Sequence, residues 1–141
     1  MVYIDTSVVV PLLTMEPSSE SVTEWFASLQ EMPVSSDWLL TEFASAISIK
    51  VRTGQLSGVA AKAVHKEFQL LASSGLRLVP VSRSAFKAAA DLAQAHIHGL
   101  RAGDALHLAV AQEMGAKTIA TLDGMMAKNA KRLKITPVKF A

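Results

Sequence analysis

The segment Val2-Tyr3-Ile4-Asp5 is the most informative part of the sequence about the fold, because a short apolar run leads directly into a carboxylate. Valine, tyrosine and isoleucine are enriched in strands, so residues 2–4 predict a short β-strand. A second apolar run at residues 8–10 follows almost at once. An unpaired carboxylate between two apolar segments would be costly, and Asp5 is therefore expected to have a partner or a function.

The same alternation of short apolar runs and amphipathic segments continues along the chain. Strands are predicted at residues 2–4, 33–35, 76–81 and 118–121 and near residue 138, with 76–81 as the clearest inner strand. Helices are predicted after Ser18, over residues 37–54, 57–74, 82–98 and 105–114, and after Asp123, with serine or aspartate caps and closing glycines. This order predicts an α/β fold with a parallel sheet covered by helices on both faces.

Length and composition limit the class of protein. A chain of 141 residues is the size of one domain, so residues 1–141 are expected to fold as a single unit. It has no cysteine, which excludes disulfides, thiolate metal sites and a cysteine nucleophile. No apolar run approaches the roughly 20 residues of a membrane helix, and the first residues resemble no secretory signal. We therefore expect a cytoplasmic protein without a membrane partner.

Four acidic residues occupy positions that favour one common site. Asp5 and Asp123 follow predicted strands, and parallel sheets form their sites beyond the carboxyl ends of the strands. Glu42 and Asp104 lie near predicted helix starts, where the helix dipole favours negative charge. Three of the four also have an ordinary interpretation: a helix start for Asp104, a solvated helix face for Glu42, and a turn for Asp123 before Gly124.

Convergence of these acids would require a counter-charge. Two unit charges about 4 Å apart repel by roughly 4 kcal/mol at an effective dielectric of about 20. Mg²⁺ takes oxygen ligands and keeps several waters, and Mn²⁺ accepts the same ligands. Such an ion can polarise a phosphodiester and activate water, so no serine or histidine nucleophile is needed.

The charge of the remaining residues suits a polyanionic substrate. The other eight acidic residues stand against 14 Lys and Arg, which leaves +6 outside the proposed site. A basic group surrounds the later acids, and its members are candidates for RNA phosphate contacts or simply a solvated helix face: Arg101, Lys128, Lys131, Arg132 and Lys134.

Four motifs resemble the PIN-domain ribonucleases, most closely the VapC-type toxins of toxin-antitoxin pairs. In chain order, these are Tyr3-Ile4-Asp5-Thr6-Ser7, Thr41-Glu42-Phe43-Ala44, Leu100-Arg101-Ala102-Gly103-Asp104-Ala105-Leu106-His107 and Thr121-Leu122-Asp123. The resemblance covers almost the whole chain, and the motif around Asp104 is its most specific part.

The resemblance implies an endoribonuclease in which Asp5, Glu42, Asp104 and Asp123 hold Mg²⁺ or Mn²⁺. It further implies that the hydroxyl of Ser7, and in second place that of Thr6, supports the carboxylates or a metal-bound water. The implied architecture is a five-stranded parallel sheet. The implied partners are an RNA substrate such as tRNA, a second copy of the chain in a homodimer, and a cognate antitoxin that blocks the site.

Two alternatives remain open from the sequence. In an aspartyl-phosphate phosphatase, Asp5 would attack phosphate directly, but that class usually has a second aspartate where this chain has Ser7. A catalytically inactive PIN-like module that binds nucleic acid or protein is the other alternative. Sensitivity of RNA cleavage to EDTA separates a nuclease from such a module.

Overall fold

The computed structural model describes all 141 residues and contains one parallel sheet of five strands. The strands are β1 (Val2–Ile4), β2 (Val34–Ser36), β3 (Arg77–Val79), β4 (Thr118–Ala120) and β5 (Thr136–Pro137), in the order β3-β2-β1-β4-β5. All four neighbouring pairs are parallel. The predicted α/β fold with a five-stranded parallel sheet is confirmed.

Seven α-helices connect and cover the strands. They are α1 (Thr6–Leu13), α2 (Ser19–Ala27), α3 (Trp38–Arg52), α4 (Gly58–Leu70), α5 (Arg83–Gln94), α6 (Ala102–Glu113) and α7 (Gly124–Arg132). A π-helical turn, Leu71–Gly75, extends α4, and a 3₁₀ turn, His96–His98, lies between α5 and α6. The predicted cap of α5 is present, because the hydroxyl of Ser82 accepts a hydrogen bond from the backbone N–H of Ala85. Ser18 and Asp37 precede α2 and α3 without capping them through their side chains, since both already have helical backbone angles.

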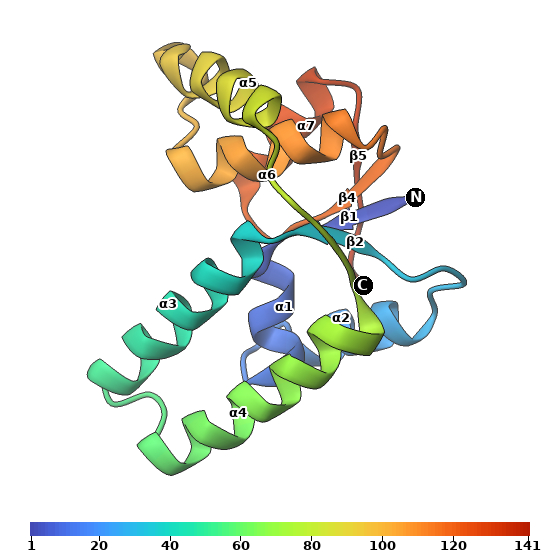
Figure 1. Cartoon of the computed structure of the whole chain (residues 1–141). Coiled ribbons are helices and arrows are strands. Elements are labelled where there is room, and N and C mark those ends of the chain that lie inside the picture. Colours follow the sequence, from blue (N-terminus) through green and yellow to red (C-terminus); the bar gives the residue numbers. More distant parts are fainter.

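Side chains of the central strand alternate between two cores. Tyr3 joins a cluster with Ile119 and residues of α5, α6 and α7, while Ile4 joins a second cluster with Ala120 and residues of α1 to α4. This is the period-two alternation of a strand that is buried on both faces. Figure 1 shows the corresponding layers, with α1 to α4 on one side of the sheet and α5 to α7 on the other, which confirms the expected double-sided cover.

Three details of the predicted elements are wrong. Residues 76–81 do not form an inner strand: only Arg77–Val79 pair, and they form the edge strand β3. Their apolar character comes instead from packing into both cores, with Leu76 and Leu78 on one face and Val79 and Val81 on the other. The helix predicted over 82–98 ends at Gln94, and the one predicted from 105 begins at Ala102.

Helix α1 was not expected, because three consecutive valines at 8–10 favour a strand by propensity. The chain turns into a helix at this point because Asp5 caps it, accepting a hydrogen bond from the backbone N–H of Ser7. Burial of all three valines against the α3 and α4 side of the molecule then outweighs their weak intrinsic preference. No helix in the structure has both the length and the apolar character required to cross a membrane.

Two isoleucines of α3 provide a matched test of the core. Ile47 is fully buried, whereas Ile49, two residues later on the same helix, is 45% exposed. We expect Ile47→Ala to lower the free energy of unfolding by about 2–5 kcal/mol through lost burial and an unfilled cavity. The same change at Ile49 should stay within about 0.5 kcal/mol in urea denaturation. Equal effects at the two positions would contradict the packing of α3 described above.

Candidate active site

The strand order reverses at the centre of the sheet, between β1 and β4. From β1 the chain proceeds outward through β2 to β3 on one side, and through β4 to β5 on the other. In parallel sheets such a reversal opens a crevice beyond the carboxyl ends of the strands. Asp5 directly follows β1, and Asp123 follows β4 after two intervening residues. The acids predicted from the sequence therefore begin at the position where a site is expected.

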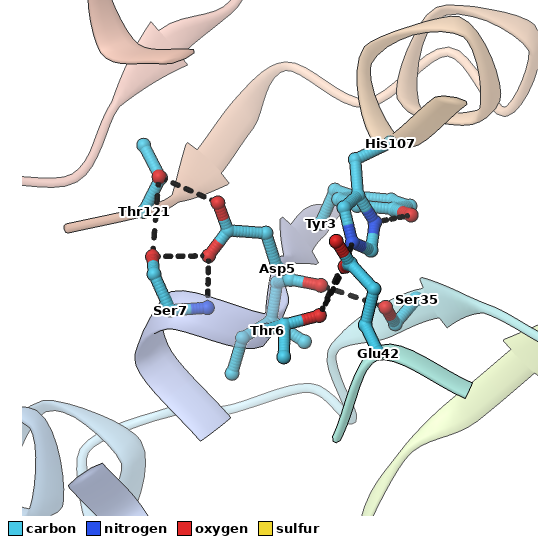
Figure 2. A network of polar contacts seen from close by, with 9 residues as sticks. Tyr3, Asp5, Thr6, Ser7, Ser35, Glu42, His107 and Thr121 are labelled. Atoms are coloured by element: carbon cyan, nitrogen blue, oxygen red, sulfur yellow. Dashed lines mark hydrogen bonds and ion pairs between the residues drawn. The ribbon is translucent and has the colours of Figure 1, made fainter. Parts of the chain in front are cut away.

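Asp5 is held firmly by groups from two elements (Figure 2). Its Oδ1 accepts hydrogen bonds from the backbone N–H and the hydroxyl of Ser7, at 3.0 and 2.6 Å, and its Oδ2 accepts one from the hydroxyl of Thr121 at 2.6 Å. The residue is only 3% exposed. Burial raises the pKa of Asp5, although these hydrogen bonds and nearby His107 work in the opposite direction. The carboxylate consequently has one fixed orientation.

Glu42 lies in the second turn of α3 and is held through one oxygen. Its Oε1 accepts hydrogen bonds from the hydroxyl of Thr6 and from Nε2 of His107, each at 2.5 Å. Burial pushes the pKa of Glu42 upward, but the hydrogen bond and charge of His107, together with Thr6, outweigh it and the net shift is downward. The buried indole N–H of Trp38 also favours the charged form, although it makes no hydrogen bond of good geometry. Glu42 is therefore a carboxylate over the ordinary pH range.

Asp104 lies in the first turn of α6 and is less restrained than Asp5 or Glu42. Partial burial raises the pKa of Asp104 to about 6, and the negative charges of Asp123, Asp5 and Glu42 add to this effect. The influence of all three acids on Asp104 means that the four carboxylates share one electrostatic environment. The structure therefore brings the four sequence-predicted acids together at one edge of the sheet.

Asp123 caps the last helix. Its Oδ1 accepts a hydrogen bond of 2.9 Å from the backbone N–H of Met126, at the first turn of α7. Asp5 caps α1 in the same way, and Asp104 belongs to the first turn of α6. Three helix N-termini thus direct their partial positive charge to this edge of the sheet, which helps to explain how neighbouring carboxylates are tolerated there.

No lysine or arginine is paired with the acidic edge. The ion pairs of the structure join Lys50 to Glu16 and His107 to Glu42, so Asp5, Asp104 and Asp123 have no cationic partner. No three His, Asp or Glu side chains lie close enough together to enclose a metal ion by direct contacts alone.

A divalent cation that keeps part of its water shell suits carboxylates spread in this way, and Mg²⁺ does so commonly. The available donors are carboxylate oxygens, which also suit Mn²⁺. Their unpaired negative charge supplies the attraction that such a cation requires. The chemistry of the donor set therefore fits either ion.

Two supporting residues were not identified from the sequence. Thr121 donates a hydrogen bond to Asp5, and its Oγ1 also accepts one from the backbone N–H of Asp123 at 3.1 Å. Its position directly after a buried strand was the available signal. Tyr3, on the buried strand β1, contacts His107, with 2.7 Å between the tyrosine hydroxyl and Nδ1 of the histidine. Nothing in the spacing of these residues indicates that contact.

The basic residues considered from the sequence are exposed on the surface. Arg101 precedes α6, and Lys128, Lys131 and Arg132 are exposed on α7. Lys128 and Arg132 line a cavity of about 300 Å³ between α7 and the turn at residues 96–98. Contact of these residues with RNA phosphates stays a prediction.

Comparisons with known proteins agree with this architecture. The model of the PIN domain family matches residues 2–132. VapC20 of Mycobacterium tuberculosis, a toxin that cleaves the sarcin-ricin loop, is 20% identical, with a TM-score of 0.74 over 92% of this chain and 95% of that one. FitAcB of Neisseria gonorrhoeae is 21% identical, with a TM-score of 0.76 over 99% and 97%. VapBC2 of Rickettsia felis, bound to a DNA fragment from its promoter, is 18% identical, with a TM-score of 0.69 over the full length of both chains.

No curated protein sequence matches the chain. At these identities the solved structures establish a shared fold, while the family match extends over almost the entire sequence. The matched segment includes all four acids of the sheet edge and the helices that carry them. The chain belongs to the PIN domain family.

Proposed function

We propose that this chain is a metal-dependent endoribonuclease and the toxin of a toxin-antitoxin pair. Asp5, Glu42, Asp104 and Asp123 would hold Mg²⁺ or Mn²⁺ and direct hydrolysis of RNA phosphodiester bonds. The observation that supports this most is the raised pKa of Asp104, about 6, which reflects burial beside three further acids without a lysine or arginine partner. Such an edge attracts a divalent cation.

The residues of the chain divide the task between them. Asp5 and Glu42 are fixed by hydroxyl and imidazole donors, which suits groups that must keep one geometry. Ser7 orients the Asp5 carboxylate through its hydroxyl rather than acting as a nucleophile. Asp104 has the freedom to adapt to an ion or a water. A bound divalent cation would polarise the phosphodiester and make water a stronger nucleophile.

The same contacts argue against an aspartyl-phosphate phosphatase. A nucleophilic Asp5 would have to bring a free oxygen against the phosphorus of its substrate. Both oxygens of Asp5 instead accept hydrogen bonds, and the side chain is almost completely buried. A role for Asp5 as a fixed acceptor beneath a cation is more consistent with this environment.

The toxin assignment is supported by the relatives that share the fold. VapC20 is described as a toxin that cleaves the sarcin-ricin loop, and VapBC2 as a complex on its promoter DNA. We propose by analogy a cognate antitoxin that covers the acidic edge, a homodimeric state, and an RNA substrate. Mapping the ends of cleaved cellular RNA would distinguish tRNA from ribosomal RNA as the target.

Cleavage of total cellular RNA tests the proposed activity. With Mg²⁺ or Mn²⁺ we expect defined fragments, which should vanish in EDTA. Asp5→Asn keeps the shape of the side chain but removes its charge, and we expect its cleavage rate to fall about 100-fold or more. A loss of about 3 kcal/mol of transition-state stabilisation corresponds to that factor.

A folded Asp5→Asn protein, verified by circular dichroism, is the control for this comparison. Lys62→Ala is a second control, because it removes an exposed positive charge from α4, which carries none of the four acids. Cleavage that persists in EDTA would contradict the proposal. Absence of cleavage with either metal, in antitoxin-free folded protein, would favour the inactive binding module instead.

The pKa of Asp104 generates a second test, through stability. Its value of about 6 in the folded chain lies above the ordinary 3.8, so ionising Asp104 costs stability as the pH rises from about 4 through 6. Asp104→Asn does not titrate. Its stability relative to the unaltered chain in EDTA should therefore be greater at pH 7.5 than at pH 4.5. We expect a change of about 1 kcal/mol, allowing for solvent screening of a partly exposed group, or roughly 3 °C in melting temperature.

Melting curves at the two pH values measure this difference directly, and groups that do not interact with Asp104 cancel from the comparison. Adding Mn²⁺ at pH 7.5 should stabilise the unaltered chain more than Asp104→Asn. A stability difference that does not change with pH would show that the pKa of Asp104 is not raised in the folded chain.

A further inference from the structure

A chain of two hydrogen bonds runs from the buried centre of the sheet to the partly buried Glu42 (Figure 2). The hydroxyl of Tyr3, on β1, lies 2.7 Å from Nδ1 of His107, on α6. Nε2 of the same ring lies 2.5 Å from Oε1 of Glu42, on α3. Tyr3 is fully buried and His107 is 1% exposed. The His107 imidazole thus links α6 to β1 and α3, which are distant from it in the sequence.

The proton positions along this chain follow from the chemistry of its ends. An ionised carboxylate only accepts hydrogen bonds, so Nε2 of His107 must carry the proton that Glu42 accepts. Burial raises the pKa of Tyr3, which therefore keeps its phenolic proton. The Tyr3 hydroxyl donates to Nδ1 of a neutral imidazole and accepts from the Nδ1–H of a charged one. In either state the two contacts fix the orientation of the ring and direct Nε2–H at Glu42.

The two oxygens of Glu42 have different surroundings. Oε1 is engaged by His107 and by the hydroxyl of Thr6. Oε2 lies against the first turn of α6, where a Cβ added to Gly103 would stand only 2.7 Å away. Glycine at 103 thus leaves the space that this oxygen occupies. Gly103 directly precedes Asp104, and the charge of Glu42 is among those that raise the pKa of Asp104.

We infer that His107, backed by Tyr3, is a positioning residue for Glu42, which holds Oε1 so that Oε2 can serve as a metal ligand. This inference rests on the function proposed above. Gly103 completes the arrangement, since any larger residue would displace Oε2. In metal sites, loss of a group that orients a ligand typically costs about 10- to 100-fold in metal affinity. We assign an effect of that size to His107.

The affinity of the whole chain for Mn²⁺ alone, measured by isothermal titration calorimetry, tests the assignment without requiring activity. His107→Asn shortens the side chain and loses the contact with Glu42, and we expect it to bind Mn²⁺ about 10- to 100-fold more weakly. His107→Gln places an amide N–H near the position of Nε2 and should recover part of the affinity. Tyr3→Phe removes a single oxygen and leaves the Glu42 contact in place, so we expect a smaller loss.

The matched control is His65→Asn. His65 is half-buried on α4 and packs edge-on against Phe43, with ring centroids 6.3 Å apart. The His65→Asn variant therefore loses a histidine that does not contact the acids. Its Mn²⁺ affinity should equal that of the unaltered chain. Gly103→Ala tests the other oxygen of Glu42, because the added Cβ would displace Oε2, and it should also weaken Mn²⁺ binding. Melting curves identify any variant that is not folded.

Kinetics of RNA cleavage separate positioning from substrate binding. At saturating Mn²⁺, we expect His107→Asn to lower kcat while leaving KM for RNA within about twofold, because the residue acts through Glu42. Unchanged Mn²⁺ affinity in folded His107→Asn and Tyr3→Phe, beside an unaltered chain that binds the metal, would overturn the role of His107 alone. An unaltered chain that neither binds Mn²⁺ nor cleaves RNA would instead overturn the proposed function and this inference with it.

Discussion

Burial of the Asp5 carboxylate at the end of the central strand is the constraint on which the remaining arrangement depends. A charge in this position requires donors, and they come from the first turn of α1 and from Thr121 after β4. The same contacts start a helix where three valines would favour a strand, and they join the two central strands at their carboxyl ends. The geometry of the crevice thus follows from satisfying one acid.

The acidic edge combines two kinds of carboxylate. Asp5 and Glu42 are fixed by several donors, whereas Asp104 has a raised pKa and Asp123 is held only as a helix cap. Helix N-termini and hydroxyl groups offset part of the repulsion, but no lysine or arginine offsets the rest. The residual cost is what a divalent cation would relieve. The metal-free protein is therefore less stable than it would be without this repulsion, and the same repulsion favours binding of a cation.

Much of the fold was predictable, because short apolar runs, caps and closing glycines act locally. The acid after β1 and the cap at Ser82 are examples in which neighbouring residues suffice. The edge position of β3 was missed, since an apolar strand packed between two cores resembles a central one. The contacts of Asp5 with Thr121 and of Tyr3 with His107 span more than 100 residues, and no local pattern encodes such pairs.

The central claim is that the four acids form one metal site. Anomalous diffraction from crystals soaked in Mn²⁺ tests it most directly, because the ion is located independently of any model of the protein. We expect a single strong peak, or a pair of peaks, at the carboxyl edge of the sheet within coordination distance of Asp5 and Glu42, directly or through water. Peaks confined to other surfaces of the molecule, with the acidic edge free of metal, would contradict the claim.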